Sequence, residues 1–567
     1  MTEIRAAILC SFNLDTLPRY LGPALARKNL PARFHFGGFG QYRQEILDDR
    51  SDLYAFGPEF VFLFLDGQDV LADLCQRPFD LAPEEREAYV DESYGELKGL
   101  VDVLARRLPE AVLFVHTLAA PPLNSLGLLE FNSAFGLRDA FARFNGSLAA
   151  LARARERVYL LDYESLVGYH GYKNWFDPRM WTLGRMRLGR MAVESLADYY
   201  ATVLSAARGA RKKVLVLDLD DTLWGGVLGA EGPGGILLGT DGIGLAFREF
   251  QQEILNLHRR GILLAINSKN NPEEALEVFD QHPAMVLRRE HFAGMRINWQ
   301  DKASNMRELA QGLNLGLDSF VFMDDSPVEC EWVSSQIPDV TVVQLPEDPA
   351  LYRDTLLRLD AFASFGLTEE DLRRGELYQE QTLRRGLRES VPTLEEFYEA
   401  LNMRALVTPA SDLTVSRIAQ LTEKTNQFNL TTRRYSEAEV RSLVSRPDWE
   451  VFGLSLTDKF GDSGLVGVGI LAREGETARI DTLLLSCRVM GRTIETAFLA
   501  FLAEWAAHRG ARLMVGEYIA TKKNGPVERL YEAHGFEPMD SQGHMWQLDL
   551  ESYDVACPEY IDLEYHE

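Results

Sequence analysis

The chain has 567 residues, of which 46% are apolar and 25% are charged, and this length predicts three or four domains rather than a single core. Its net charge of −26 disfavours binding to nucleic acid or to an anionic membrane surface. No apolar run reaches the ~18–20 residues of a membrane span. Five scattered cysteines do not form a disulfide framework, and the short apolar N-terminus does not read as a signal peptide. We therefore expect a soluble cytoplasmic protein that binds neither nucleic acid nor membrane.

In chain order, the patterns predict an α/β protein of three domains. Residues 1–208 alternate helix-like segments with strand-like runs at 6–12, 60–65, 111–117 and 157–163, which predicts a parallel sheet. A second α/β set spans 209–365, with strand-like runs at 214–219, 262–267, 319–325 and 340–345. Residues 366–392 are strongly charged and helix-like, as in a linker. The third unit, 393–567, has strand-like runs at 450–458, 463–471 and 478–486 that lead into an apolar-striped helix at 492–510.

The first strand of the second set runs directly into acids. Strand periodicity places Asp218 and Asp220 on one side and turns Asp221 away, while Thr222 offers a hydroxyl. Two close carboxylates repel unless a cation joins them, and Mg²⁺ suits hard oxygen ligands and phosphate. The alternative is a helix N-cap.

The order of the downstream residues favours the cation. Ser268 ends the next strand, Lys302 stands at a helix start, and Asp324 and Asp325 end a further strand. This series resembles the four motifs of the haloacid dehalogenase (HAD) superfamily of phosphotransferases, met in order over about 110 residues. The resemblance covers the Asp218–Thr222 motif DxDx[TV].

That resemblance implies a mechanism and a fold. It implies that Asp218 is the phosphoryl-accepting nucleophile and that Asp220 is the general acid/base. It also implies that the phosphate group is bound by Thr222, Ser268 and Lys302. Mg²⁺ would be held by Asp218, the Asp220 carbonyl and an acid of the Asp324–Asp325 pair. Ser326 replaces the more usual asparagine, so which acid binds directly stays open. Little chain separates Asp218 from Ser268, so the Rossmann-like domain has no room for a large cap, and the open site suits a bulky or protein-attached substrate.

A second chemistry is suggested by "SCRVMGR", Ser486 to Arg492, between a strand and a helix. Gly491 permits close backbone approach, and the helix start with Arg488 and Arg492 favours an anion. Together with the later "NGPVERLYEAHGF", this loop resembles the pyrophosphate loop of the GNAT acyltransferase fold. Cys487 beside Arg488 and a helix N-terminus should form a thiolate readily; the alternative is a small buried filler. Cys330 lies among acids, which should raise the pKa of its thiol.

Several stretches of the chain together resemble the FkbH-like glyceryl transferase/phosphatases of polyketide biosynthesis, in HAD subfamily IIIC. They include "INSKNNPEEA", "INWQDKASN", "FVFMDDSPVE", "LTEKTNQFNLTTRRYS", "DKFGDSGLVG" and "LLSCRVMGRTIE". The resemblance implies that a phosphoglyceryl group from 1,3-bisphosphoglycerate is taken onto Cys487, dephosphorylated at Asp218, and passed to the phosphopantetheine thiol of an acyl carrier protein.

Residues 1–208 resemble, more faintly, an SGNH hydrolase. Ser11 follows the first strand, where that fold places its nucleophile. Asp177 would begin the Asp–His pair, but Met180 stands where histidine is needed, and neither His116 nor His170 has supporting context. We expect a docking or structural role for this domain.

For the acidic carrier protein, we predict docking on a basic surface around Arg433, Arg434, Lys522 and Lys523. Two rival functions stay open. One is a HAD phosphatase fused to a CoA-dependent N-acyltransferase, for which Cys487 would be dispensable. The other is a non-catalytic docking scaffold for carrier proteins.

Overall fold

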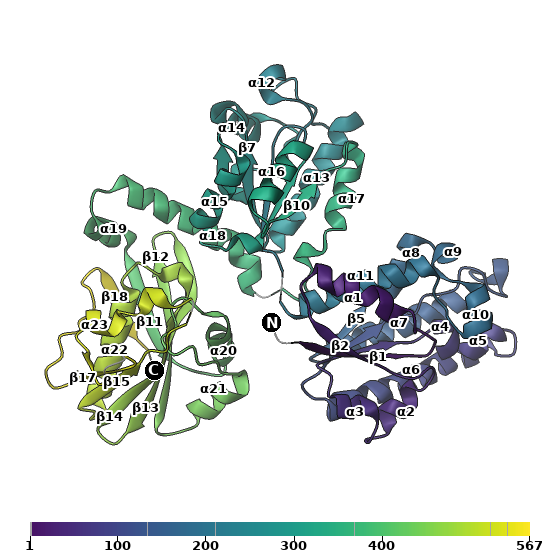
Figure 1. Ribbon diagram of the computed structural model, residues 1–567, viewed down its shortest axis with the longest axis horizontal. Helices are drawn as coiled ribbons and strands as arrows, with labels where there is room; N and C mark the ends of the chain where they lie inside the picture. Colours follow the sequence, from purple (N-terminus) through teal and green to yellow (C-terminus); the bar gives the residue numbers. More distant parts are fainter. Residues whose placement is uncertain are drawn as a thin grey trace. The chain divides into compact units, whose positions relative to one another are not determined.

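The structure is a computed structural model that describes residues 3–132, 134–209, 211–367, 369–521, 523–540 and 543–566. Its internal contacts divide the chain into two compact units, Met1–Lys212 with Leu359–Leu367, and Lys213–Arg358 with Thr368–Glu567. Three separate sheets, each with its own helices, form the framework (Figure 1). The predicted multi-domain α/β class is therefore confirmed. Among the described residues, no helix is long and apolar enough to cross a membrane.

The first unit contains a five-stranded parallel sheet in the order β2-β1-β3-β4-β5. Its strands are β1 (Ile4–Cys10), β2 (Ala32–Phe36), β3 (Phe60–Phe64), β4 (Val112–His116) and β5 (Val158–Leu161). Its longer helices are α1 (Leu17–Arg27), α6 (Pro83–Arg107), α7 (Leu137–Arg153) and α11 (Arg190–Ala207). Ile4 and Ile8 pack on one face with α1 and α11, while Ala7 and Leu9 pack on the other with α6 and α7. The alternation of β1 thus explains how helices cover both faces.

The second sheet is also parallel, with five strands in the order β10-β9-β6-β7-β8. Its strands are β6 (Val214–Leu217), β7 (Leu263–Ser268), β8 (Phe292–Ile297), β9 (Phe320–Asp324) and β10 (Thr341–Gln344). Its helices are α12 (Leu228–Glu231), α13 (Gly242–Arg259), α14 (Pro272–Gln281), α15 (Lys302–Leu313), α16 (Pro327–Gln336) and α17 (Tyr352–Leu357). Between β6 and β7 the chain forms only the short α12 and the framework helix α13, so the expected lack of a large cap is confirmed.

The third sheet has eight strands in the order β16-β17-β15-β14-β13-β12-β11-β18. They are β11 (Met403–Pro409), β12 (Trp449–Asp458), β13 (Gly461–Glu474), β14 (Thr477–Leu485), β15 (Leu513–Glu517), β16 (Glu537–Pro538), β17 (Met545–Asp549) and β18 (Ile561–Tyr565). The pair β14 and β15 is parallel, and α22 (Ile494–His508) follows β14, as the strand–turn–helix pattern predicts. Apolar clusters join one face to α22 and the other to α20 (Val415–Lys424) and α21 (Glu437–Val444).

The segments around the predicted linker have distinct places. Residues 359–367 group with the first unit, where the Phe365 ring lies 5.3 Å from Phe114 and 4.8 Å from Tyr159. The expected boundary at residue 365 therefore falls inside a segment packed on the first unit. The helix-like pattern of 366–392 corresponds to α18 (Glu369–Ser390), which is followed by α19 (Leu394–Leu401).

Candidate functional site

Acidic side chains meet at the carboxyl ends of two neighbouring strands. β6 and β9 pair in parallel, and the Asp218 N–H donates to the Met323 carbonyl at 3.2 Å. This register brings Asp218 next to Asp324 at the edge where parallel sheets place their ligand sites. Carboxylate oxygens of Asp218, Asp324 and Asp325 lie within 4.8 Å of one another.

Lys302 joins two of these acids. Its Nζ lies 2.8 Å from Asp218 Oδ2 and 2.5 Å from Asp324 Oδ2, and its side chain is 2% exposed. Lys302 is the first residue of α15, whose start is fixed by the Asp301 carboxylate and by Asn267, which donates to the Lys302 carbonyl at 2.9 Å. Burial acts against the charge on Lys302, but Asp218 and Asp324 outweigh it and raise the pKa of the ammonium. Lys302 is therefore a permanent cation at the base of the site.

The donor set fits a divalent cation. Asp218 Oδ1 is buried, and no described group donates a hydrogen bond to it. Burial, and then the charge of Asp218, raise the pKa values of the carboxyls of both Asp324 and Asp325. Three carboxylates facing one ammonium leave an excess of negative charge, which hard oxygen-preferring Mg²⁺ would neutralise. Asp218, Asp324 and Asp325 are thus the residues that would hold the metal.

Asp220 is held apart from that cluster by three donors. Its Oδ1 accepts from Trp224 Nε1 at 3.0 Å and from the Leu228 N–H at 3.1 Å, and its Oδ2 accepts from Asn270 Nδ2 at 3.0 Å. Burial raises the pKa of the Asp220 carboxyl, although the Leu228 and Trp224 donors oppose the shift. A fixed carboxyl with a raised pKa suits an acid/base role. Its side chain takes no part in the acidic cluster, so only its carbonyl stays a predicted metal ligand.

The turn after β6 requires a glycine at position 226. Asp221 has φ 50°, and its Oδ1 accepts from the Gly226 N–H at 2.7 Å, so its carboxylate is used within the turn. Gly226 has φ 89°, and a Cβ there would lie 2.6 Å from the Glu231 carboxylate. Only glycine fits this position without strain. The turn thereby delivers the Leu228 N–H to Asp220.

The two predicted phosphate-binding hydroxyls have different places. Ser268 is the last residue of β7, next to β6, and it is buried at the same sheet edge as Asp218. The Thr222 hydroxyl instead donates to Asp325 Oδ1 at 3.3 Å and so positions a carboxylate of the cluster. Asn267, Asn270 and Trp224 complete the site, and sequence reasoning did not single them out.

Cys487, the predicted nucleophile, belongs to the turn between β14 and α22. We call this turn, residues 486–493, the thiol turn. Cys487 begins the single 3₁₀ turn Cys487–Val489, and its side chain lies outside the described residues. Gly491 is exposed, has φ 75°, and meets no atom within 4 Å on the side where a Cβ would stand.

Arg492 differs from the expectation. Its guanidinium is buried, pairs with Asp458 at 3.0 Å, and donates to the Arg488 carbonyl at 2.6 Å. Burial, and then Arg384, lower the pKa of Arg492 to about 10. The predicted role of Arg492 as a free anion-binding cation is therefore wrong, because its charge is used inside the protein.

The segment "TNQFNLTT" runs beside the thiol turn. The Leu485 N–H donates to the Phe428 carbonyl at 3.0 Å, and the Leu430 N–H donates to Leu483 at 3.2 Å. On its other side the Leu430 carbonyl accepts from the Ile519 N–H at 2.8 Å. The segment therefore fills the space where β14 and β15 separate, just before Ser486.

The predicted docking surface is smaller than expected. Arg433 pairs with Asp481 at 2.7 Å and with Glu517 at 2.6 Å, so its charge is neutralised within the domain. This corrects the prediction for Arg433, whose acidic partners are distant in the sequence. Arg434 is exposed but bonds to Asn426 Oδ1 at 2.7 Å, Lys523 is exposed, and Lys522 lies outside the described residues.

Four cysteines other than Cys487 have unreactive surroundings. Burial raises the pKa values of the Cys10, Cys75 and Cys330 thiols to about 12, and it also raises that of Cys557. For Cys330 the charge of Asp324 adds to the effect, as the sequence predicts.

In the first unit, Ser11 lies at the switch point between β1 and β3. Its hydroxyl donates to Asp69 at 2.9 Å and accepts from the Asp66 N–H at 2.9 Å. Asp177 caps helix α10 (Pro178–Gly184) through the Arg179 and Met180 N–H groups. His116 is buried between the Leu63 carbonyl and the Tyr200 hydroxyl, each at 3.0 Å. Ser11, Asp177 and His116 are thus each bonded to other groups, and the docking or structural role of this domain stays a prediction.

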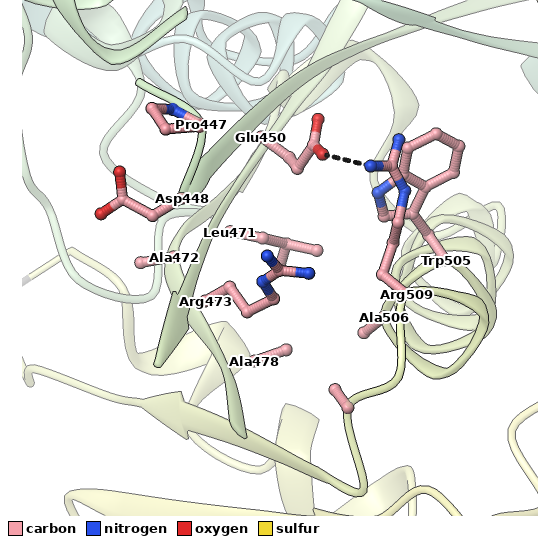
Figure 2. Close-up of a pocket in the computed structure, with 11 residues that line it drawn as sticks. Pro447, Asp448, Glu450, Leu471, Ala472, Arg473, Ala478, Trp505, Ala506 and Arg509 are labelled. Carbon is pink, nitrogen blue, oxygen red and sulfur yellow. Dashed lines mark ion pairs between the residues drawn. The ribbon is translucent and has the colours of Figure 1, made fainter. Parts of the chain in front are cut away.

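A pocket of about 50 Å³ lies between strands β12, β13 and β14 and the C-terminal end of α22 (Figure 2). Leu471, Ala478 and Ala506 line it, and an ion pair between Arg509 and Glu450, at 3.7 Å, borders it. α22 has 15 residues, so roughly 20 Å of helix separates this pocket from the thiol turn. None of the predicted site residues lines it.

No protein-family model and no curated protein matches the chain. Among solved structures, the N-terminal part of the protein BF1531 from Bacteroides fragilis, containing a phosphatase domain complexed with Mg, is 27% identical. That match covers 65% of this chain and 96% of the other, with a TM-score of 0.60.

Two acetyltransferase structures each match about a quarter of the chain. The ribosomal-protein-S18-alanine N-acetyltransferase from Escherichia coli is 14% identical over 26% of this chain and 96% of its own, with a TM-score of 0.21. The GNAT domain of S. lividans PAT is 18% identical over 25% of this chain and 89% of its own, also with a TM-score of 0.21.

Proposed function

We propose that this chain is a bifunctional enzyme, a Mg²⁺-dependent HAD-type phosphatase fused to an acyltransferase, with a phosphoglyceryl thioester as the shared intermediate. The observation that carries the phosphatase part is the contact of Lys302 with both Asp218 and Asp324, beside an Asp218 oxygen that lacks a hydrogen-bond donor. The likeness to a phosphatase-containing structure complexed with Mg supports the same reading.

In the phosphatase step, an Asp218 oxygen attacks phosphorus and forms an acyl phosphate. The bond from phosphorus to the substrate oxygen breaks, and Asp220 gives that oxygen its proton. Water then attacks the acyl phosphate, Asp220 takes back a proton, and inorganic phosphate leaves. Lys302 offsets the negative charge of Asp218 and of the phosphate. Mg²⁺, when bound, would supply further positive charge there.

In the transfer step, the Cys487 thiolate attacks the carbonyl carbon of 1,3-bisphosphoglycerate, and the bond to the 1-phosphate breaks. After the remaining phosphate is removed, the phosphopantetheine thiol of an acyl carrier protein loses its proton to solvent, and its sulfur attacks the thioester. The bond from carbon to the Cys487 sulfur breaks, and the thiolate returns. Each exchange starts from a carbonyl that is already activated, so the reaction needs no ATP.

Intact-mass spectrometry with Mg²⁺ and 1,3-bisphosphoglycerate tests this function. The wild-type protein should gain one glyceryl group and lose it when a phosphopantetheinylated carrier protein is added. Asp218→Asn should stop at an adduct that is heavier by one phosphate. Exposed Asp241, which caps no N–H group of α13, provides the matched control Asp241→Asn, which should behave as wild type. Normal dephosphorylation by Asp218→Asn would refute the assignment.

A further inference from the structure

A buried carboxylate connects helix α18 to the hairpin of β12 and β13. Asp458 ends β12, and its side chain is 0% exposed. Its Oδ2 lies 2.6 Å from Arg384 Nε, and its Oδ1 accepts from the second Arg384 nitrogen at 2.9 Å. Arg384 is 74 residues away in the sequence and also pairs with Glu380 at 2.9 Å. The charged helix predicted as a linker is thus fixed to the third sheet by a two-point ion pair.

The same carboxylate reaches the thiol turn. Asp458 Oδ2 also lies 3.0 Å from one terminal nitrogen of Arg492, whose other terminal nitrogen donates to the Arg488 carbonyl at 2.6 Å. Arg488 is the residue after Cys487, within the 3₁₀ turn. Two acids, Glu380 and Asp458, balance the charges of Arg384 and Arg492. The network therefore ends on the backbone of the turn that carries the predicted nucleophile.

The backbone on either side of Arg492 has an unusual conformation. Gly491 has φ 75° and Thr493 has φ 59°, a left-handed conformation that a threonine seldom adopts. The Tyr398 hydroxyl donates to the Gly491 carbonyl at 3.2 Å, and the Thr493 hydroxyl lies 3.0 Å from the Tyr560 hydroxyl. Such backbone persists only where its surroundings hold it, and here each of the three residues has a tether.

An ordinary stabilising ion pair would explain these contacts less well. Burying four charged groups costs desolvation, and apolar residues of similar size often stabilise a fold equally well. The contacts here instead converge on a single turn. We propose that Asp458 is a positioning residue for the transfer reaction, and that α18, through Arg384, belongs to the transferase site. This inference rests on the proposed role of Cys487.

Asp458→Asn provides the test, because it keeps the shape and removes one negative charge. We expect kcat for loading of the carrier protein to fall about 10- to 100-fold, since small displacements of reacting groups are costly, while KM stays nearly unchanged. The pH dependence of Cys487 alkylation, followed by peptide mass spectrometry, should shift to lower pH, because the network then carries extra positive charge. Slower transfer together with easier thiolate formation would separate positioning from loss of structure.

Asp481→Asn is the matched control. Asp481 is buried in the same domain and pairs with Arg433 and Arg479, and neither arginine belongs to the 487–492 turn. This variant should keep the kcat and the alkylation profile of the wild type. A wild-type kcat in Asp458→Asn, or an equal loss in Asp481→Asn, would overturn the proposal.

Two further measurements keep the test decisive. If Asp458→Asn does not fold, Arg384→Met keeps the pair between Asp458 and Arg492 and should lower kcat by a smaller factor. Because this variant loses a positive charge, alkylation of Cys487 should shift to higher pH, opposite to the shift in Asp458→Asn. An unchanged kcat in Arg384→Met would refute the role of α18. If the wild-type protein never carries an acyl group on Cys487, the proposed function fails. In that case, an Asp458→Asn alkylation profile identical to that of the wild type would overturn the positioning role separately.

Discussion

Lys302 is the residue whose charge holds two buried carboxylates together. Replacing it by methionine leaves Asp218 and Asp324 facing each other without a cation, which should lower the free energy of unfolding by about 3–5 kcal/mol in the absence of metal. Because Mg²⁺ would restore a cation, it should raise the melting temperature of Lys302→Met more than that of the wild type. Thermal unfolding in EDTA and in MgCl₂ measures both effects.

Lys269→Met is the control for this comparison. Lys269 lies close in sequence to Ser268, but its side chain is 38% exposed and pairs with Glu329 on the surface. Loss of the pair between Lys269 and Glu329 should change the free energy of unfolding by less than about 1 kcal/mol, with or without metal. A Lys302→Met variant that is indifferent to Mg²⁺ would argue against the metal site.

The thiols should differ sharply in reactivity. Cys10, Cys75 and Cys330, with pKa values near 12, remain protonated at pH 8, and alkylation requires the thiolate. Iodoacetamide at pH 8 should therefore label Cys487 first in the folded chain. Peptide mass spectrometry after a short exposure measures this order. Labelling of Cys330 before Cys487 would remove the basis for a nucleophilic thiol.

His116 makes the first unit sensitive to acid. Burial lowers the pKa of its imidazole from 6.5 to about 4, so the folded chain excludes a proton that the unfolded chain binds. The stability from this histidine is present above pH 6.5 and is lost as the pH falls toward 4. Between pH 7.5 and pH 5 the loss should be roughly 2 kcal/mol. In urea unfolding, His116→Gln should lose less unfolding free energy than the wild type between pH 7.5 and pH 5. The control His508→Gln, at a side chain that is 78% exposed, should match the wild type.

At the scale of elements, the turn between β6 and α12 is set by a single glycine. Gly226→Ala would force a Cβ toward the Glu231 carboxylate at a positive φ, and the turn that orients Asp220 would shift. We expect a loss of about 1–3 kcal/mol in stability and a larger loss of aryl-phosphate hydrolysis. Gly229→Ala, which meets no atom within 4 Å in helix α12, should leave both unchanged or slightly raise the stability. Equal behaviour of the two variants would refute this account of the turn.

The strand ends could be predicted from the sequence because local patterns determine them. Asp218 and Asp324 follow aliphatic runs whose parallel pairing brings their ends together, so periodicity and motif order sufficed. The donors Trp224 and Asn270 were missed, since nothing in their residue type reveals that they converge on Asp220.

Long-range ion pairs explain why the predictions for Arg433 and for helix α18 differ from the structure. Arg433 looked like free basic surface because its partners Asp481 and Glu517 lie 48 and 84 residues further along the chain. The charged composition of α18 indicated a linker. The burial of Arg384 depends on Asp458 in strand β12, which lies 74 residues further along the chain. Charge patterns predict exposure well only where no distant residue of opposite sign approaches.

On the scale of the whole molecule, the two proposed centres belong to different sheets. Cys487→Ala should accept no glyceryl group and yet hydrolyse an aryl phosphate at the wild-type rate. Asp218→Asn should do the opposite, loading the thiol while its aryl-phosphate hydrolysis falls on the order of a thousandfold or more. Cys487→Ser refines the comparison, because an oxygen ester should form slowly and pass poorly to a thiol. Carrier loading by Cys487→Ala at the wild-type rate would instead favour direct transfer, as in a CoA-dependent acyltransferase.

The return of residues 359–367 to the first unit gives the chain an unusual covalent topology. The Lys212 N–H donates to the Ala361 carbonyl at 2.9 Å, and Lys28 pairs with Asp360 at 2.5 Å, so the stretch 213–358 leaves and re-enters the first unit at one point. That stretch, which carries the sheet of β6 to β10, is an insertion whose two ends are joined by non-covalent contacts. A protease that nicked it would cut the backbone without releasing either fragment, since Phe365 would still anchor the distal piece against Phe114 and Tyr159. A chain that lacked its first two hundred residues would keep the second sheet but expose Phe365, whose aromatic partners Phe114 and Tyr159 would be gone.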